Sequence, residues 1–252
     1  MWWVDRGASG PVTRGVANPL PAFVRAQSEL PEQVRTLVLE PRGGRLTYTL
    51  LRERDAQFGD VETVPDADLM RDLDDLVAEL ASGRGSAPVD RLAQYAVQYI
   101  LAEAPVDPSL EVALDSAPGL LRVSNPGESS LWEVGTETGR MRVVDAEGNA
   151  IIVPSEPVDT QVSLPAGAAD RLIQMAELSD PGWSAQADGR TLDVRGVNGW
   201  AQGFVAPPTA VDVEIAHDNQ VRMVLNWVSL VGFLVLIVLA LPTLRRERES
   251  TV

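Results

Sequence analysis

The chain contains no cysteine and no lysine, and its only histidine is His217. The missing cysteines exclude disulfides, thiolate metal sites and cysteine nucleophiles, although they leave the cellular compartment open. One histidine cannot build a multi-histidine metal site, and a serine–histidine hydrolase would have to use that residue as its base. From the residues alone we assign no catalytic residue, no metal site and no cofactor.

Positive charge is scarce as well. The 252 residues carry a formal net charge of −15, and arginines cluster only in the last residues. Because a nucleic acid requires a basic surface opposite its phosphates, we expect no nucleic-acid partner. The same shortage disfavours binding of the main domain to anionic lipid.

A long uncharged stretch lies near the C-terminus. Residues 223–244 hold no charged side chain, and 22 residues span the hydrocarbon core of a bilayer at the rise of an α-helix. A buried core helix would need protein on every side, whereas only a few polar residues follow. We therefore predict a transmembrane helix over residues 221–244, with the lipid bilayer as a partner.

The flanking residues predict how this helix is oriented. Arg245, Arg246 and Arg248 follow the uncharged stretch, so the tail 245–252 is expected in the cytoplasm and the main domain outside it. Trp227 lies at the other end of the stretch. An indole prefers the headgroup region, which places Trp227 at the outer interface of the cell membrane.

The N-terminus lacks the pattern of a signal peptide. The apolar start, residues 1–4, is followed at once by Asp5 and Arg6, which leaves no room for an apolar signal or a first span. Export of a domain ahead of a C-terminal helix normally needs an upstream signal, so we expect membrane spans before this chain. Trp2 and Trp3 then mark the outer end of such a span, and residues 1–21 form an exit loop. A tail-anchored protein is the alternative.

The remaining residues predict an α+β fold with two subdomains. Residues 22–118 alternate helix and strand patterns: 35–39 and 45–51 flank a turn and predict a hairpin, and 69–80 repeat leucine and valine at helical spacing. This half should be a mixed α/β subdomain. From residue 119 to 220, short strands separated by turns, including a hairpin on Asp188-Gly189, predict an antiparallel β-sandwich.

Two residue sets suggest binding sites. Asp66 and Asp68 match a metal-binding Asp-any-Asp pattern, although capping of the helix that follows explains them better, and a solvated helix face explains the acidic residues after them. Trp132, Trp183 and Trp200 form a possible glycan-stacking platform. Aromatic residues at alternating strand positions more often fill a sandwich core, and we favour the core interpretation.

Several segments, taken in order, resemble a known family. Pro181-Gly182-Trp183 followed by Asp188-Gly189 is similar to a pattern near the C-terminus of large polytopic bacterial glycosyltransferases. Further segments look like the C-terminal region of actinobacterial family-2 membrane glycosyltransferases; they are residues 20–24, 95–101, 105–108, 113–115, 118–124, 131–134 and 200–204. The resemblance covers most of the chain, and the order of the segments carries it.

The resemblance implies a function for the chain as part of a larger protein. In such glycosyltransferases the sugar-transfer domain is cytoplasmic and precedes many membrane spans, so this chain would be the extracytoplasmic C-terminal module and last span. It would handle the acceptor or assist assembly, with an envelope glycan or the membrane part of the glycosyltransferase as partner. The alternative is a stand-alone single-span protein with a binding or structural role in the envelope. An extracellular hydrolase ranks below both, because no carboxylate pair has a distinctive context.

The predicted orientation can be tested in the intact parent protein. A reporter enzyme that is active only in the cytoplasm should be active when fused after Val252 and inactive when inserted at the turn that contains Gly43, because the arginine tail stays inside. Reporter activity at Gly43 would contradict the orientation.

Overall fold

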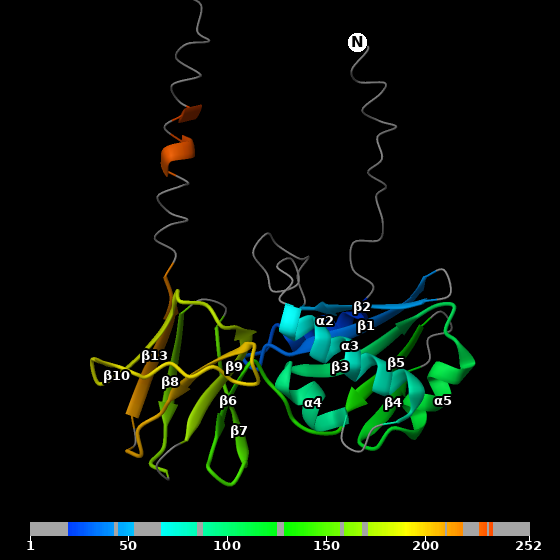
Figure 1. Cartoon of the computed structure of the whole chain (residues 1–252), viewed down its shortest axis with the longest axis horizontal. Helices are drawn as coiled ribbons and strands as arrows, with labels where there is room; N and C mark the ends of the chain where they lie inside the picture. Colours follow the sequence, from blue (N-terminus) through cyan, green and yellow to red (C-terminus); the bar gives the residue numbers. More distant parts are fainter. Residues whose placement is uncertain are drawn as a thin grey trace, which may run out of the picture. The chain divides into compact units, whose positions relative to one another are not determined.

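The computed structural model describes residues 20–42, 45–52, 67–84, 88–124, 129–156, 159–167, 171–209, 211–218, 227–230 and 232–233. The chain divides into two units, Met1–Ala216 and His217–Val252. The described part of the first unit contains two lobes (Figure 1). We call the residues up to Gly135 the first lobe and the residues from Arg140 to Ala216 the second lobe.

The first lobe is a five-stranded sheet with helices on both faces. The strands lie in the order β2-β1-β3-β5-β4; β1 and β3 are parallel, and the other neighbours are antiparallel. Apolar residues of three helices, α3, α4 and α5, share one core with the sheet, and α2 covers the opposite face. The elements are α2 (Ala22–Ser28), β1 (Arg35–Arg42), β2 (Arg45–Leu51), α3 (Ala67–Ser82), α4 (Pro88–Gln94), β3 (Val97–Glu103), α5 (Pro108–Ser116), β4 (Leu120–Ser124) and β5 (Ser129–Val134).

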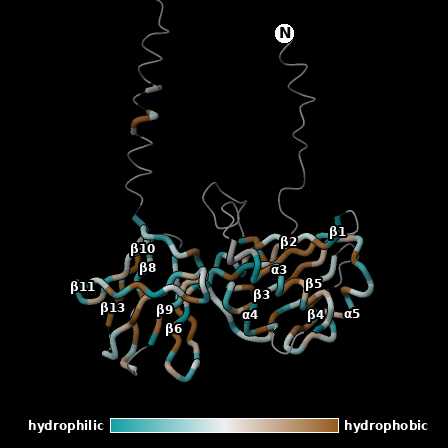
Figure 2. The backbone as a smooth tube through the Cα atoms, in the orientation of Figure 1, coloured by the Kyte–Doolittle hydropathy of each residue, from teal (hydrophilic) through white to brown (hydrophobic). Residues whose placement is uncertain are grey.

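The second lobe consists of two four-stranded sheets packed face to face. Their orders are β11-β10-β13-β8 and β12-β9-β6-β7, and apolar residues from both sheets form one core. Buried and exposed residues alternate along β8 and β13, as half-buried strands require. Figure 2 shows the hydropathy of the residues along the same strands. The strands are β6 (Met141–Val144), β7 (Ala150–Val153), β8 (Asp159–Leu164), β9 (Leu172–Leu178), β10 (Trp183–Ala187), β11 (Arg190–Thr191), β12 (Ala201–Val205) and β13 (Val211–His217).

The α+β class and the antiparallel, sandwich-like packing of the second lobe are confirmed, as are both hairpins. β1 pairs antiparallel with β2, and Asp188 and Gly189 connect β10 to β11 with φ angles of +51° and +72°. Two positive φ angles are typical of the turn that matches the strand twist of a two-residue hairpin.

The predicted boundary between residues 118 and 119 is wrong. β4 and β5 belong to the first sheet, where β5 pairs with β3 from Tyr99↔Glu133 to Glu103↔Ser129. Leu120 and Trp132 complete the core beneath α3, α4 and α5. The local strand pattern of residues 120–134 shows that they form strands, but it carries no information on which sheet they join.

Most of the predicted membrane segment lies outside the described residues. Residues 227–230 and 232–233 are helical, and 63% of Trp227 is exposed. No helix within the described ranges is long and apolar enough to cross a bilayer. Trp2, Trp3, Arg245, Arg246 and Arg248 also lie outside these ranges.

A buried ion cluster joins the two lobes. Glu177 on β9 accepts hydrogen bonds from Arg140, which precedes β6 (Nε···Oε1 2.7 Å), and from Arg35 at the start of β1 (Nη2···Oε2 3.3 Å). Arg52, which follows β2, forms a third ion pair with Glu177. Arg35, Arg140 and Glu177 are all buried. Burial alone would raise the pKa of Glu177, but the charges of the three arginines outweigh it and hold the pKa well below its usual range.

An aromatic stack and a shared core reinforce this connection. Tyr95 of the first lobe lies against Trp200 of the second, with ring centroids 4.9 Å apart and ring planes within 12°. Ala176, Val197 and Trp200 also belong to the apolar core of the first lobe. The lobes therefore bury apolar surface as well as charge against each other.

We expect Glu177→Gln to lower the free energy of unfolding by about 3–5 kcal/mol, because it removes the negative charge with which three arginines, two of them buried, form ion pairs. Chemical denaturation of the full chain in detergent measures this change. The control is Glu147→Gln, an exposed carboxylate in the turn between β6 and β7, with an expected change of less than about 0.5 kcal/mol. Equal changes in the two variants would contradict a joining role for Glu177.

The stability of the wild type and that of Glu177→Gln should depend differently on pH. A lowered pKa in the folded state stabilises the fold above the ordinary glutamate pKa of about 4.3, and this contribution is lost as the pH falls toward the lowered value. The wild type should therefore lose more stability than Glu177→Gln between neutral pH and strong acid. Parallel pH profiles of the two proteins would contradict the ionised state of Glu177.

Candidate functional site

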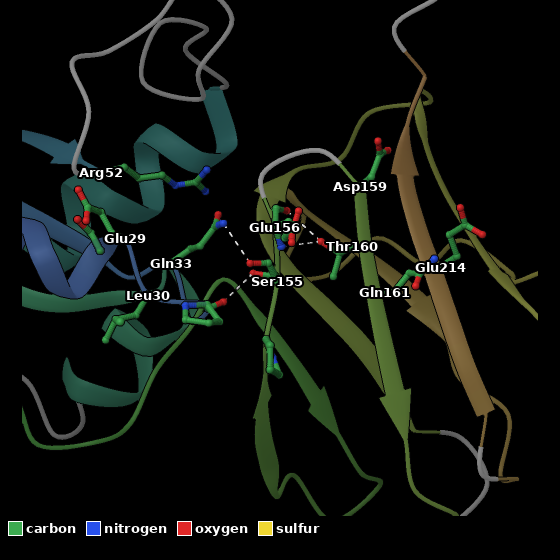
Figure 3. A pocket seen from close by; sticks show the side chains of 13 residues that line it. Glu29, Leu30, Gln33, Arg52, Ser155, Glu156, Asp159, Thr160, Gln161 and Glu214 are labelled. Atoms are coloured by element: carbon green, nitrogen blue, oxygen red, sulfur yellow. Dashed lines mark hydrogen bonds between the residues drawn. The ribbon is translucent and has the colours of Figure 1, made fainter.

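A groove of about 740 Å³ lies between the two lobes. We call it the inter-lobe groove. Its volume falls in the range of ordinary ligand sites. The connection from α2 to β1 and the end of β2 form one wall, and the β7–β8 connection, β8 and β13 form the other (Figure 3). The lining residues are Ser28, Glu29, Leu30, Pro31, Gln33, Arg52, Pro154, Ser155, Glu156, Asp159, Thr160, Gln161 and Glu214.

Hydrogen bonds between the lobes fix the base of the groove. The backbone N–H of Ser155 donates to the carbonyl oxygen of Pro31 (2.8 Å), and Nε2 of Gln33 donates to the carbonyl oxygen of Ser155 (3.1 Å) (Figure 3). Next to them, the N–H of Arg140 donates to the carbonyl oxygen of Glu32 (2.7 Å). A Cβ atom at Gly139 would lie 2.6 Å from Cγ2 of Ile152 and 3.2 Å from the carbonyl oxygen of Glu32. Glycine at position 139 therefore allows the backbone to pass close to both residues.

The groove is rich in acidic and hydrogen-bonding side chains. Glu29 lies on one wall, and Glu156, Asp159 and Glu214 lie on the other. Arg52 is the arginine among the lining residues, and it is ion-paired with Glu177. None of the four carboxylates makes a hydrogen bond or ion pair within the described part of the chain. They are therefore available to accept hydrogen bonds from a ligand.

The acidic residues of α3 behave differently, because their side chains connect elements. Asp72 accepts hydrogen bonds from Arg91 (2.9 Å) and from the hydroxyl of Tyr95, and Asp74 accepts one from the hydroxyl of Tyr48 (2.8 Å). Burial, together with these carboxylates, raises the pKa of both tyrosines. The predicted solvated helix face therefore holds for Asp74, which is exposed, and Asp72 is partly exposed; both side chains also tie α3 to its neighbours.

No metal site stands out. Within the described ranges, no group of three or more His, Asp or Glu side chains lies where it could hold a metal ion. The side chains of Asp66 and Asp68 lie outside the described part, so their suggested metal-binding or capping role stays a prediction. The inter-lobe groove presents amides, hydroxyls and carboxylates, and such a set recognises a hydroxyl-rich ligand by hydrogen bonds.

The three tryptophans do not form a stacking platform. Trp132 is fully buried and donates a hydrogen bond from Nε1 to Asp115 (2.8 Å), and Trp200 is buried against Tyr95. Trp183 is half-buried, with the guanidinium of Arg140 5.5 Å from its ring centroid. A glycan-stacking role is therefore wrong for Trp132 and Trp200, and the core interpretation holds for these two.

Sequence reasoning did not identify the groove residues. Gln33 and Ser155 are 122 positions apart and meet only because the lobes pack together. The segments that contain them carry no recognised motif, and turn-forming prolines beside them are their only local signal. No protein-family model, curated protein or solved structure shows significant similarity to this chain.

The burial of the tryptophans leads to a stability prediction. We expect Trp132→Ala and Trp200→Ala each to lower the free energy of unfolding by about 3–5 kcal/mol, as is typical of large core aromatics. Trp183→Ala should cost clearly less, because Trp183 is only half-buried. Denaturant titration of the three variants measures the difference. An equal cost at all three positions would contradict this assignment.

Proposed function

We propose that the chain is the extracytoplasmic C-terminal module and last membrane span of a cell-envelope glycosyltransferase, and that its folded domain holds the acceptor glycan. Sugar transfer itself would take place elsewhere in the parent protein. The observation that carries the proposal is the inter-lobe groove, whose carboxylates make no hydrogen bond or ion pair with the described part of the chain.

The ends of the folded domain support attachment to a membrane. In Figure 1, the start of α2 and the end of β13 lie at the same edge of the domain. A domain held between two membrane spans needs both ends on one side. The uncharged stretch 223–244 and the arginines after it supply the second of these spans in the proposal.

The composition of the groove supports binding rather than transfer chemistry. A nucleotide-sugar donor carries a diphosphate, which needs a metal ion or clustered basic groups. Four of the five charged residues that line the inter-lobe groove are acidic, and the fifth, Arg52, is ion-paired with Glu177. An uncharged sugar polymer is not repelled by the acidic lining, and its many hydroxyls can form hydrogen bonds with these carboxylates and amides.

Calorimetry on the full chain in detergent tests this proposal, with envelope polysaccharide fragments as ligands. We expect weak binding and no turnover of sugar donors. Glu156→Ala combined with Asp159→Ala should weaken binding about tenfold, as the loss of about 1.4 kcal/mol from two hydrogen-bonding groups implies.

A matched double variant serves as the control. Glu137→Ala with Glu147→Ala removes two exposed carboxylates outside the inter-lobe groove and should leave the affinity within about twofold. Absence of glycan binding would contradict the proposal. Donor turnover that disappears on mutation of one carboxylate would replace it with an enzymatic function.

A further inference from the structure

A second hollow, of about 580 Å³, lies over three neighbouring strands of the second lobe. We call it the outer hollow. It opens on the face of the β11-β10-β13-β8 sheet that points away from the sandwich core, because its residues on β8, β13 and β10 include exposed positions that alternate with core positions. Its lining residues are Gln161, Val162, Ser163, Gln186, Asp188, Gly189, Asp212, Val213 and Glu214.

The two hollows are continuous. Gln161 and Glu214 line both the inter-lobe groove and the outer hollow. β8 is the last strand of its sheet, so the surface passes from the inter-lobe groove around the free edge of β8 and onto the outer face. Both hollows lie within the same compact unit of the chain.

The side chains along this surface are suited to hydroxyl groups. Gln161, Gln186 and Glu214 make no side-chain hydrogen bond to other described residues, and the hydroxyl of Ser163 donates to Asp212 (2.6 Å). Side-chain amides both donate and accept, and carboxylates accept, so together they match the alternating donors and acceptors of sugar hydroxyls. Exposed apolar side chains do not line the outer hollow.

The charge along the surface selects among polymers. Glu29, Glu156, Asp159 and Glu214 line the inter-lobe groove, and Asp188 and Asp212 extend the acidic lining across the outer hollow. A polymer of uronates or phosphodiesters would meet like charge along its whole length, and such juxtaposition costs binding energy. An uncharged polymer avoids this cost.

We propose that the inter-lobe groove and the outer hollow form one continuous binding track for an extended, uncharged glycan chain of several sugar units. The inference rests on the proposed glycan-binding function and adds the length and charge of the ligand. Neighbouring strands lie about 4.8 Å apart, so the path from β8 across β13 to β10 alone covers about 10 Å, and the inter-lobe groove extends it further.

The test uses the full chain in detergent and uncharged oligosaccharides released from envelope polysaccharide and sorted by length. Affinity should rise about tenfold or more from the disaccharide to the longer fractions and then level off when the track is filled. A uronate-containing fraction of matched length should bind about tenfold more weakly, and added salt should narrow the gap because it screens the repulsion.

Variants of the outer hollow separate this inference from the proposed function. Gln186→Ala with Asp212→Ala should reduce the affinity for long fractions to that for short ones and leave short fractions unaffected, with circular dichroism as the check on folding. Glu137→Ala with Glu147→Ala is again the control. The continuous track is wrong, and the proposed function of the inter-lobe groove stands, if two results are found together. The affinity does not depend on oligosaccharide length or on Gln186→Ala with Asp212→Ala, and Glu156→Ala with Asp159→Ala still weakens binding. If no uncharged fraction binds, both are wrong, and equal binding of uronate fractions would overturn the charge selection.

Discussion

The arrangement of the domain depends on the ion cluster at Glu177. Two of its arginines, Arg35 and Arg52, come from the hairpin of the first lobe, whereas Arg140 and Glu177 come from the second. Taking a carboxylate and two guanidinium groups out of water is costly, and only the mutual attraction at short distance offsets this cost. The cluster therefore forms only in one relative position of the lobes, and the Tyr95–Trp200 stack buries apolar surface in that same position.

The inter-lobe groove follows from this arrangement. Arg52 belongs both to the cluster and to the lining, so the ion pair with Glu177 connects the buried contact to the solvent-facing wall. The hydrogen bonds of Ser155 and Gln33 across the base fix the two walls against each other. A preorganised groove of this kind loses little conformational freedom when a ligand binds, and this helps a site that relies on hydrogen bonds to solvent-exposed side chains.

The acidic residues serve two different purposes in this chain. On α3, Asp72 and Asp74 accept hydrogen bonds from arginine and tyrosine side chains of neighbouring elements, and these contacts dock the helix. On β8 and β13, Asp159 and Glu214 lie at exposed strand positions and make no such pair with the described residues. The net charge of −15 therefore does not describe one uniform surface. The distinction between structural and available carboxylates supports the groove as the binding surface.

The sequence by itself determined the local elements. The spacing of apolar residues predicted the amphipathic helix within α3, and the alternation of apolar and acidic residues predicted β13. Asp188-Gly189 predicted its hairpin. Each of these patterns depends on residues that are neighbours in the chain. Only the tertiary structure decided that β4 and β5 join the first sheet and that Trp132 and Trp200 fill the core of the first lobe rather than that of the sandwich. Only the tertiary structure places Gln33 in contact with Ser155 and three arginines around Glu177. These contacts join residues that are far apart in the sequence, and no local pattern of side chains encodes such pairings.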